Sequence, residues 1–459
     1  MTADAPSMPR NPAQPSDMAE PADLAKAEAA YERFVWDHLP RNFAGHFIHG
    51  ALGMTGFRLV NSLTIMPAYL SLLSGGSALF VGLGQSLQQL GGVVSPVVGA
   101  TFVEHRRKVL PVSLVMGVLM RVQVLILALA GFFLHGRPLL FVVLGALFLL
   151  GLFSGAQGVA FQLLLAKVIP ITRRGALQAV RNMVGGSIAA GLAWWAGDYL
   201  VQRNVFGNGY GVTFLIAFFL TSAGLLALGL LMVEPSPPRV RPRTRLAARL
   251  REFPSLFVQD RGFMNFMIAQ TLATAGRIGV PFYVLFAGRS MSLDGKTVGL
   301  LSLISLGADT STNLLWGLTG DRFGFRFTFI LSLAFWIAGT ALLMAAPSLP
   351  VVHLAGMSLG SVGFILLAFF ALGGAQSGFL MSSQTMVLEF GAREDVPMRL
   401  ALMATGQGTM NALTPLLGGL IAATLGYETL FGFSAVLLAV SLFLLIFLVE
   451  EPRLRRAAA

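Results

Sequence analysis

Apolar residues along this chain gather in long runs that alternate with short polar connections. A helix needs about 20 apolar residues to cross the hydrocarbon core of a bilayer. Because lipid offers no hydrogen-bond partners, each run must satisfy its own backbone and is predicted to be a transmembrane helix. The predicted spans are 44–70, 77–101, 109–134, 139–166, 176–200, 210–233, 263–287, 297–319, 327–346, 351–385, 400–424 and 427–449. The tenth span is overlong and is expected to run past the membrane to Glu389.

Polar residues inside these spans repeat at a nearly constant separation. Arg58 lies near the middle of the first span and Arg277 in the middle of the seventh, at an offset of 277 − 58 = 219. Internal duplication of this kind is typical of secondary transporters, whose substrate site lies between the halves near the bilayer midplane. Two further landmarks share the offset: Val233-Glu234-Pro235 with Glu450-Glu451-Pro452 (452 − 235 = 217), and Gly155-Ala156-Gln157 with Gly374-Ala375-Gln376 (376 − 157 = 219).

The fold class that follows is an all-α integral membrane protein with twelve transmembrane helices in two pseudo-symmetric six-helix bundles. The stretch 23–40 mixes helix formers with aromatic residues, which is typical of an amphipathic helix at the membrane surface or of an ordered approach to the first span. The predicted segments are an N-terminal tail (1–43), a first bundle (44–233), a basic linker (234–262), a second bundle (263–449) and a C-terminal tail (450–459).

Composition supports the membrane class. Hydrophobic residues make up 55% of the 459 residues and charged residues only 12%. The net charge is +11, but the Lys and Arg residues are concentrated in the connections that follow the even-numbered spans. This asymmetry predicts cytoplasmic termini, and it explains the charge without nucleic-acid binding. The chain has no cysteine, which excludes disulfides and thiolate metal sites.

A glycine-rich, charged loop follows the eighth span. It reads Gly317-Leu318-Thr319-Gly320-Asp321-Arg322-Phe323-Gly324-Phe325-Arg326. Its glycines permit a tight turn between two helices. Asp321 can accept hydrogen bonds from a helix N-terminus, and the arginines can pair with acids or lipid phosphates.

This loop resembles the G-x-x-x-D-R-x-G-x-R signature of the major facilitator superfamily. The resemblance implies that the loop acts as a latch between the halves in one access state. The residues to which it assigns this role are Gly317, Asp321, Arg322, Gly324 and Arg326, with Glu104 and Arg106 in the degenerate counterpart between spans two and three.

The chain departs from the pattern of multidrug antiporters in this superfamily. The fourth span has no arginine of the R-x-x-x-G-x-G kind, and the fifth lacks the glycine-proline antiporter motif. The eleventh span does contain Thr414-Pro415-Leu416-Leu417-Gly418-Gly419, which resembles the end of that motif. After the fourth span, Ile169-Pro170 followed by Arg173, Arg174 and Gly175 resembles a large group of bacterial facilitators. The resemblance therefore implies a transporter fold in the cytoplasmic (inner) membrane of a bacterium and names no substrate.

Arginines in the middle of spans one and seven are the first candidates for substrate contact. A guanidinium group in lipid is costly and should face protein or a water-filled cavity. Arg58 and Arg277 together would suit an anionic group, because each can offer a planar, bidentate contact. The alternative is that each arginine bonds Asp309, a glutamine or backbone carbonyls and only holds its bundle together. Further polar candidates for substrate binding are Asn61, Gln88, Gln157 and Gln376.

Asp309 is the deepest acid and is the candidate for proton coupling, with a permanent ion pair to Arg277 as the alternative. Arg121, in the third span, is expected to be structural. His46 and His49 share one helical face but lack a third ligand, so no metal is expected, and no cofactor motif is present.

The sequence thus predicts a secondary active transporter, not an enzyme, that moves a small organic solute, with an anion as first candidate, by proton-coupled alternating access. The alternatives are a proton-coupled exporter of drug-like or amphiphilic compounds and a non-transporting sensor or assembly protein on the same scaffold. Expected partners are the solute, protons or another coupling ion, and membrane lipids, with the chain working as a monomer.

Overall fold

The computed structural model describes residues 21–103, 106–236, 260–354, 357–390 and 396–451. Most of the predicted basic linker, Glu104, residues 1–20 of the predicted N-terminal tail and residues 452–459 of the C-terminal tail lie outside these ranges. The helices of the first half are α1 (Pro21–Asp37), α2 (Leu39–Val60), α3 (Ile65–Leu73), α4 (Ala78–Val103), α5 (Leu110–Phe133), α6 (Gly136–Val168), α7 (Ile171–Trp195), the π-helical turn η1 (Ala196–Val201), the 3-10 turn η2 (Val205–Gly207) and α8 (Gly209–Leu231).

The second half repeats this order after the linker. Its elements are α11 (Arg261–Gly276), the 3-10 helix η3 (Arg277–Phe282), α12 (Tyr283–Ala287), α13 (Gly295–Phe323), α14 (Phe325–Ala345), strands β1 (Val352–Leu354) and β2 (Met357–Leu359), α15 (Ser361–Met386), the 3-10 turn η4 (Val387–Glu389), α16 (Val396–Thr424) and α17 (Gly426–Phe447). The predicted all-α fold with two groups of six spans is confirmed, with one small hairpin added.

Seven helices in the described part of the chain are each long and apolar enough to cross a membrane on their own. They are α5, α6, α8, α13, α14, α15 with η4, and α17. The remaining predicted spans coincide with α2–α3, α4, α7–η1, α11–η3–α12 and α16.

Two predicted spans are not continuous helices. The first breaks between α2 and α3, where the Ser62 hydroxyl accepts a hydrogen bond from the Ile65 backbone N–H at 2.8 Å and so caps the new helix. The seventh changes into a 3-10 helix at Arg277, with Pro281 inside it. Proline removes a backbone donor and disrupts a regular helix. The breaks occupy equivalent places in the two halves, because Arg58 lies at the end of α2 and Arg277 lies at the end of α11.

The predicted start of the tenth span is wrong. Residues 352–354 and 357–359 pair as an antiparallel hairpin, and α15 begins only at Ser361. The prediction treated the hairpin and the helix as one span because both are apolar. The β-branched residues Val351 and Val352 nevertheless favour a strand. At the other end, the expected continuation to Glu389 is confirmed by η4.

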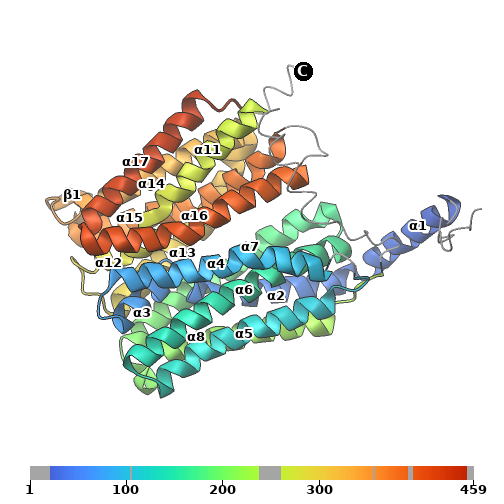
Figure 1. Cartoon of the computed structure of the whole chain (residues 1–459), viewed down its shortest axis with the longest axis horizontal. Coiled ribbons are helices and arrows are strands. Elements are labelled where there is room, and N and C mark those ends of the chain that lie inside the picture. The colour runs from blue at the N-terminus through green and yellow to red at the C-terminus, as the bar shows by residue number, and fades with distance from the viewer. Residues whose placement is uncertain (1–20, 104–105, 237–259, 355–356, 391–395, 452–459) are drawn as a thin grey trace, which may run out of the picture.

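The two halves lie side by side and diverge toward the end where the linker enters and leaves (Figure 1). We call this end the linker side and the opposite end the far side. On the far side α4 packs against α16, where a Cβ added at Gly82 would lie 2.1 Å from the Pro415 carbonyl oxygen. Likewise, a Cβ at Gly197 would lie 2.4 Å from the Gly299 Cα. Such close backbone approach requires glycine, so the halves are sealed on the far side.

Hydrogen bonds between the halves support this seal. The Leu416 backbone N–H donates to the Ser86 hydroxyl at 2.8 Å, and the Lys296 N–H donates to the Gln202 side chain at 3.0 Å. The hydroxyls of Thr64 and Ser302 also bond across the interface. The segment from Thr414 to Gly419, which resembles the end of the antiporter motif, therefore lies on a surface that joins the halves.

The duplication predicted from the paired glutamates has a structural counterpart. Glu234 accepts hydrogen bonds from the Val109 and Leu110 backbone N–H groups at 2.7 and 2.8 Å, which caps the start of α5. In the second half, Glu451 lies against Gly324 at the start of α14, with its Cδ 2.6 Å from where a Cβ would be. A carboxylate at a helix N-terminus is favourable because it satisfies free donors and opposes the positive end of the dipole.

Helix α1 covers most of the stretch where an amphipathic helix was predicted. Its Tyr31 hydroxyl donates a hydrogen bond to the Lys167 carbonyl oxygen at 2.9 Å, which ties the helix to the end of α6. Burial, together with the nearby Glu234 carboxylate, raises the pKa of Tyr31 and keeps this donor protonated.

Candidate functional site

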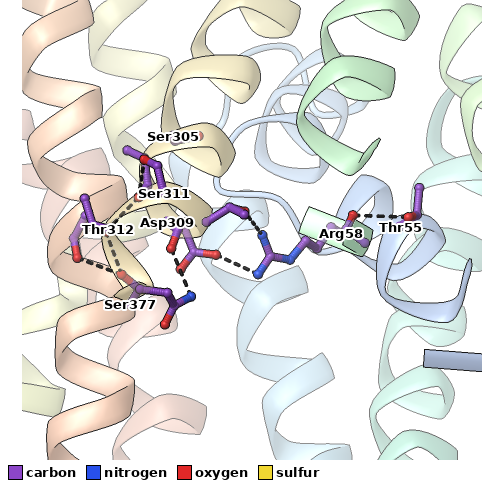
Figure 2. Close-up of polar contacts among 12 residues, drawn as sticks. Thr55, Arg58, Ser305, Asp309, Ser311, Thr312 and Ser377 are labelled. Atoms are coloured by element: carbon purple, nitrogen blue, oxygen red, sulfur yellow. Dashed lines mark hydrogen bonds and ion pairs between the residues drawn. The ribbon is translucent and has the colours of Figure 1, made fainter. Parts of the chain in front are cut away.

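An ion pair joins the two halves in the middle of the molecule. Arg58 Nη2 of α2 lies 2.7 Å from Asp309 Oδ2 of α13, and Arg58 Nη1 donates to the Thr310 hydroxyl at 3.2 Å (Figure 2). The side chains of Arg58 and Asp309 retain 18% and 14% of their exposure. The pair is thus partly shielded but still accessible, in contrast to a sealed structural bridge.

Local structure holds both partners in place. Arg58 is in the last turn of α2, three residues before the break at Asn61. One turn earlier, the Thr55 hydroxyl donates to the Ala51 carbonyl oxygen at 2.8 Å and also reaches the Gly185 carbonyl oxygen of α7 at 3.1 Å. A Cβ at Gly186 would lie 2.3 Å from the Thr310 hydroxyl oxygen, so a glycine is needed there for α13 to approach.

The ion pair lines a cavity of about 210 Å³, which we call the interface cavity. Both halves contribute to it, since its walls include Arg58 and Asn61 of the first half and Asp309 and Gln376 of the second. Asn61 also accepts a hydrogen bond from the Gln88 side chain at 2.5 Å. Four predicted residues therefore line one space, namely Arg58, Asn61, Asp309 and Gln376, and a fifth, Gln88, bonds one of them.

Arg277 has different surroundings from Arg58. It is absent from the lining of the interface cavity, and its Nη2 donates to the Gln376 side chain at 3.1 Å. Its guanidinium carbon lies 4.8 Å from the ring centroid of Phe379 and 5.3 Å from that of Trp336. Cation–π contacts and the glutamine keep this charge inside the second half. The acid expected to pair with it, Asp309, is instead bonded to Arg58.

A second cavity of about 310 Å³ lies within the first half, and we call it the basic cavity. Its polar lining includes Arg121 of α5, Arg181 of α7 and Gln157 of α6. Arg121 is only 3% exposed, and it donates to the carbonyl oxygens of Thr221 and Gly117 at 2.7 Å each. Asn61 lines this cavity as well as the interface cavity, so the two spaces adjoin at the break in the first span.

His46 and His49 are not part of a metal site in the described part of the chain. Among the residues that the structure describes, no group of three or more His, Cys, Asp or Glu side chains could hold an ion. His46 and His49 are buried and pack their rings against Phe161 at centroid distances of 4.9 and 5.1 Å. His49 also lines the basic cavity.

Comparison with known proteins gives a family match in the second half of the chain. Residues 266–459 match the family model of the Major Facilitator Superfamily. A mutant of the nucleoside transporter NupG has a similar structure, with a TM-score of 0.65 at 16% sequence identity, covering 89% of this chain and 100% of that chain. The second half therefore matches this superfamily in sequence, and the chain as a whole shares its fold with this transporter structure.

Two other solved transporter structures resemble this chain with similar TM-scores. A D-xylose-proton symporter matches with a TM-score of 0.62 at 14% identity over 91% of this chain and 98% of that chain. A bacterial homologue of the iron transporter ferroportin in the inward-facing state matches with a TM-score of 0.60 at 13% identity, covering 89% and 98%. At these identities the likeness is one of fold. No curated protein matches the chain in sequence.

The facilitator signature lies on the linker side, at the turn between α13 and α14. Gly324 has φ +91°, a conformation that favours glycine, and it ends α13. Arg326 donates to the carbonyl oxygens of Leu445 and Ile446 at 2.9 and 2.7 Å, so it caps the last turn of α17 within its own half. Asp321 and Arg322 are exposed beside it, as is Arg106 in the first half. Gly317 lies two turns before the end of α13.

Sequence reasoning missed Arg181. It lies in α7 among polar residues near the end of a span, so it carried no signal of a charge placed in lipid. A helical-wheel comparison with Gly185, four residues on and packed against Ala51 of the first span, could have placed it on the inner face of α7.

Proposed function

We propose that this facilitator is a proton-coupled secondary transporter that moves a small organic solute by alternating access. The proposal rests on one contact, the 2.7 Å ion pair between Arg58 and Asp309. This pair crosses between the halves beside a cavity, so any rocking of the halves must stretch or rearrange it. A protonated Asp309 would lose its charge and weaken the link, which gives a physical route from proton binding to a change of access.

The ion pair also favours an anion over a drug-like cation as solute. A cation would have to compete with Arg58 for the single carboxylate that lines the interface cavity. An anion can approach Arg121 and Arg181 without displacing an acid, because the basic cavity that adjoins the interface cavity has no carboxylate in its lining. Both cavities open onto the break at Asn61, so one solute can contact them in succession.

The proposed setting is a bacterial cytoplasmic membrane, with the linker side and both termini in the cytoplasm. The basic residues Arg106 to Lys108 and Arg322 to Arg326 all lie at this side, as the positive-inside rule requires. In this orientation the seal formed by Gly82 and Gly197 faces outward, and the state described here is open toward the cytoplasm. Reporter fusions after Lys108 and after Gly207 should report opposite sides.

The test is transport by the purified monomer in proteoliposomes that contain a pH-sensitive dye. A panel of small carboxylates, phosphates and amines is added outside while an imposed pH gradient is monitored. We expect one anion class to move protons in the wild type, and Asp309→Asn to abolish that movement. Asp37→Asn, on exposed α1, is the matched control and should behave as the wild type. Proton movement that persists in Asp309→Asn would refute the assigned coupling residue.

A further inference from the structure

The basic cavity contains two arginines whose charges no acid balances. Arg121 and Arg181 form no ion pair with any residue that the structure describes, and Arg121 Nη2 is buried without a hydrogen-bond partner. Elsewhere in the described interior, Arg58 pairs with Asp309 and Arg399 pairs with Asp260. Arg277 has no such acid, but its guanidinium group lies over the rings of Phe379 and Trp336 and lines neither cavity. An uncompensated guanidinium group in a membrane protein is costly unless it serves a ligand or faces water.

The shape of α2 lets Arg181 reach into this cavity. A Cβ added at Gly50 would lie 1.6 Å from Arg181 Cδ, so the arginine stem runs directly across the bare backbone of this glycine. Its guanidinium carbon then lies 6.0 Å from the ring centroid of Phe161 on α6. Gly50 and Phe161 both line the cavity, which fixes the charged end of Arg181 inside it. Only glycine at position 50 permits this path.

The remaining lining offers both polar and apolar contacts. Gln157 forms no hydrogen bond with another described residue, and a Cβ at Gly117 would lie 3.0 Å from its Nε2 and 3.1 Å from Arg121 Nη1. The amide of Gln157 and the guanidinium group of Arg121 therefore lie close together at one wall. The apolar lining consists of Met54, Phe57, Met120 and Phe161.

We infer that the basic cavity is the binding site for an organic anion, with a carboxylate or phosphate head held by Arg121 and Arg181 and a compact apolar body packed on the aromatic and methionine side chains. Two guanidinium groups can offer bidentate hydrogen bonds to such a head, while aromatic faces and flexible Met side chains accept varied apolar bodies. The volume of about 310 Å³ is at the small end of ligand pockets, which suits a body of one ring. This inference rests on the proposed transport function and names its solute class.

The experiment measures binding to purified full-length protein by calorimetry and by thermal shift, because stabilisation reports preferential binding to the folded state. The probes are benzoate and phenyl phosphate, and the matched controls are benzamide and benzylamine, which keep the ring but lack the negative charge. We expect the anions to bind and to raise the melting temperature, and we expect the two controls to do neither. Equal effects of benzoate and benzamide would overturn the inference.

Variants separate the cavity from the rest of the chain. Arg181→Gln should weaken benzoate binding by about tenfold or more, and Arg181→Lys should weaken it less, since lysine keeps the charge but loses the planar fork. Gly50→Ala should reproduce the loss without removing any charge, because its methyl group would displace the arginine stem. The controls are Arg203→Gln, an exposed arginine stacked on Tyr199, and Gly191→Ala, where a Cβ meets nothing within 4 Å. Unchanged affinity in both Arg181→Gln and Gly50→Ala would overturn the inference.

The anionic head could also belong to a lipid, and the membrane composition distinguishes the two sources. The same measurements are made in nanodiscs of neutral phosphatidylcholine and in nanodiscs with phosphatidylglycerol. A soluble anion as occupant predicts the same benzoate affinity in both. Competition by phosphatidylglycerol, lost in Arg181→Gln, would instead assign the cavity to lipid and overturn the inference. Because binding needs no turnover, a failure of transport with intact benzoate binding refutes only the proposed function.

Discussion

The two halves share one scaffold but surround their interior arginines differently. In the second half, Arg277 donates to Gln376 and lies over two aromatic rings, Arg326 caps α17, and Arg399 pairs with Asp260. In the first half, Arg121 and Arg181 line a cavity with no acid. The duplication thus preserved the helices and the glutamate caps while the charges diverged.

This difference teaches that the halves have separate tasks. In the second half, Arg277 is held among aromatic rings and Arg399 by an acid, while Asp309 reaches across the interface to Arg58. The first half keeps positive charge available next to a cavity. We therefore assign solute recognition to the first half and coupling to the contact between the halves.

The largest effect is expected at the ion pair between the halves. Arg58→Gln or Asp309→Asn alone leaves a partner without its counter-charge, which we expect to cost ~2 kcal/mol at this partly exposed site, or roughly thirtyfold in the balance of access states. The exchanged variant, Arg58→Asp with Asp309→Arg, should recover part of the transport rate. A double-mutant cycle on that rate measures the coupling. Strictly additive losses would show that the two side chains act separately.

Opening the seal on the far side should change access without touching either cavity. Gly82→Ala places a methyl group 2.1 Å from the Pro415 carbonyl oxygen and should push the halves apart there. The chain has no cysteine, so a single Asn61→Cys probe can report access cleanly. We expect a membrane-impermeant maleimide added on the far side to label Gly82→Ala several-fold faster than the parent. Gly92→Ala, with nothing nearer than 3.8 Å, is the control and should label as the parent does.

Removing the charge of Asp321 tests whether the signature loop acts as a latch between the halves. Asp321→Asn keeps the side-chain size, so we expect a several-fold lower transport rate with nearly unchanged insertion and melting temperature. Arg326→Gln should do the reverse and lower the melting temperature, because Arg326 caps α17 within one half. An unaltered rate in Asp321→Asn would reduce the loop to a signal for topology.

The smallest effect is expected at the glutamate caps, one in each half. Glu234→Gln removes a charge that accepts two backbone N–H bonds and also pairs with Lys167 at 2.9 Å, so we expect a loss of ~1–2 kcal/mol in unfolding free energy. Glu451→Gln, at the equivalent position beside Gly324, should also lower the unfolding free energy. Thermal unfolding in detergent measures both. An unchanged unfolding free energy in either variant would contradict the role of that glutamate as a cap.

Sequence reasoning identified individual polar residues better than it identified their partners. Arg58, Asp309, Asn61 and Gln376 do line one cavity, and Gln88 bonds Asn61 there. Arg121 was expected to be structural, and two of its nitrogen atoms do bond helix carbonyls. Its third nitrogen, Nη2, is buried without a hydrogen-bond partner beside a cavity that the sequence did not predict. Arg181 was missed because it lies among polar residues near the end of a span, where a charge does not stand out.

The sequence by itself determined the membrane class, the number and order of the spans, the internal duplication and the signature loop, because these depend on local hydropathy, on charge near span ends and on a shared offset. Only the tertiary structure decided that Asp309 pairs with Arg58, 251 residues away by 309 − 58, and that Arg277 stays within its own half. In a membrane protein the faces toward lipid and toward neighbouring helices are both apolar, so periodicity does not report how each helix is rotated. That rotation decides which polar side chains meet.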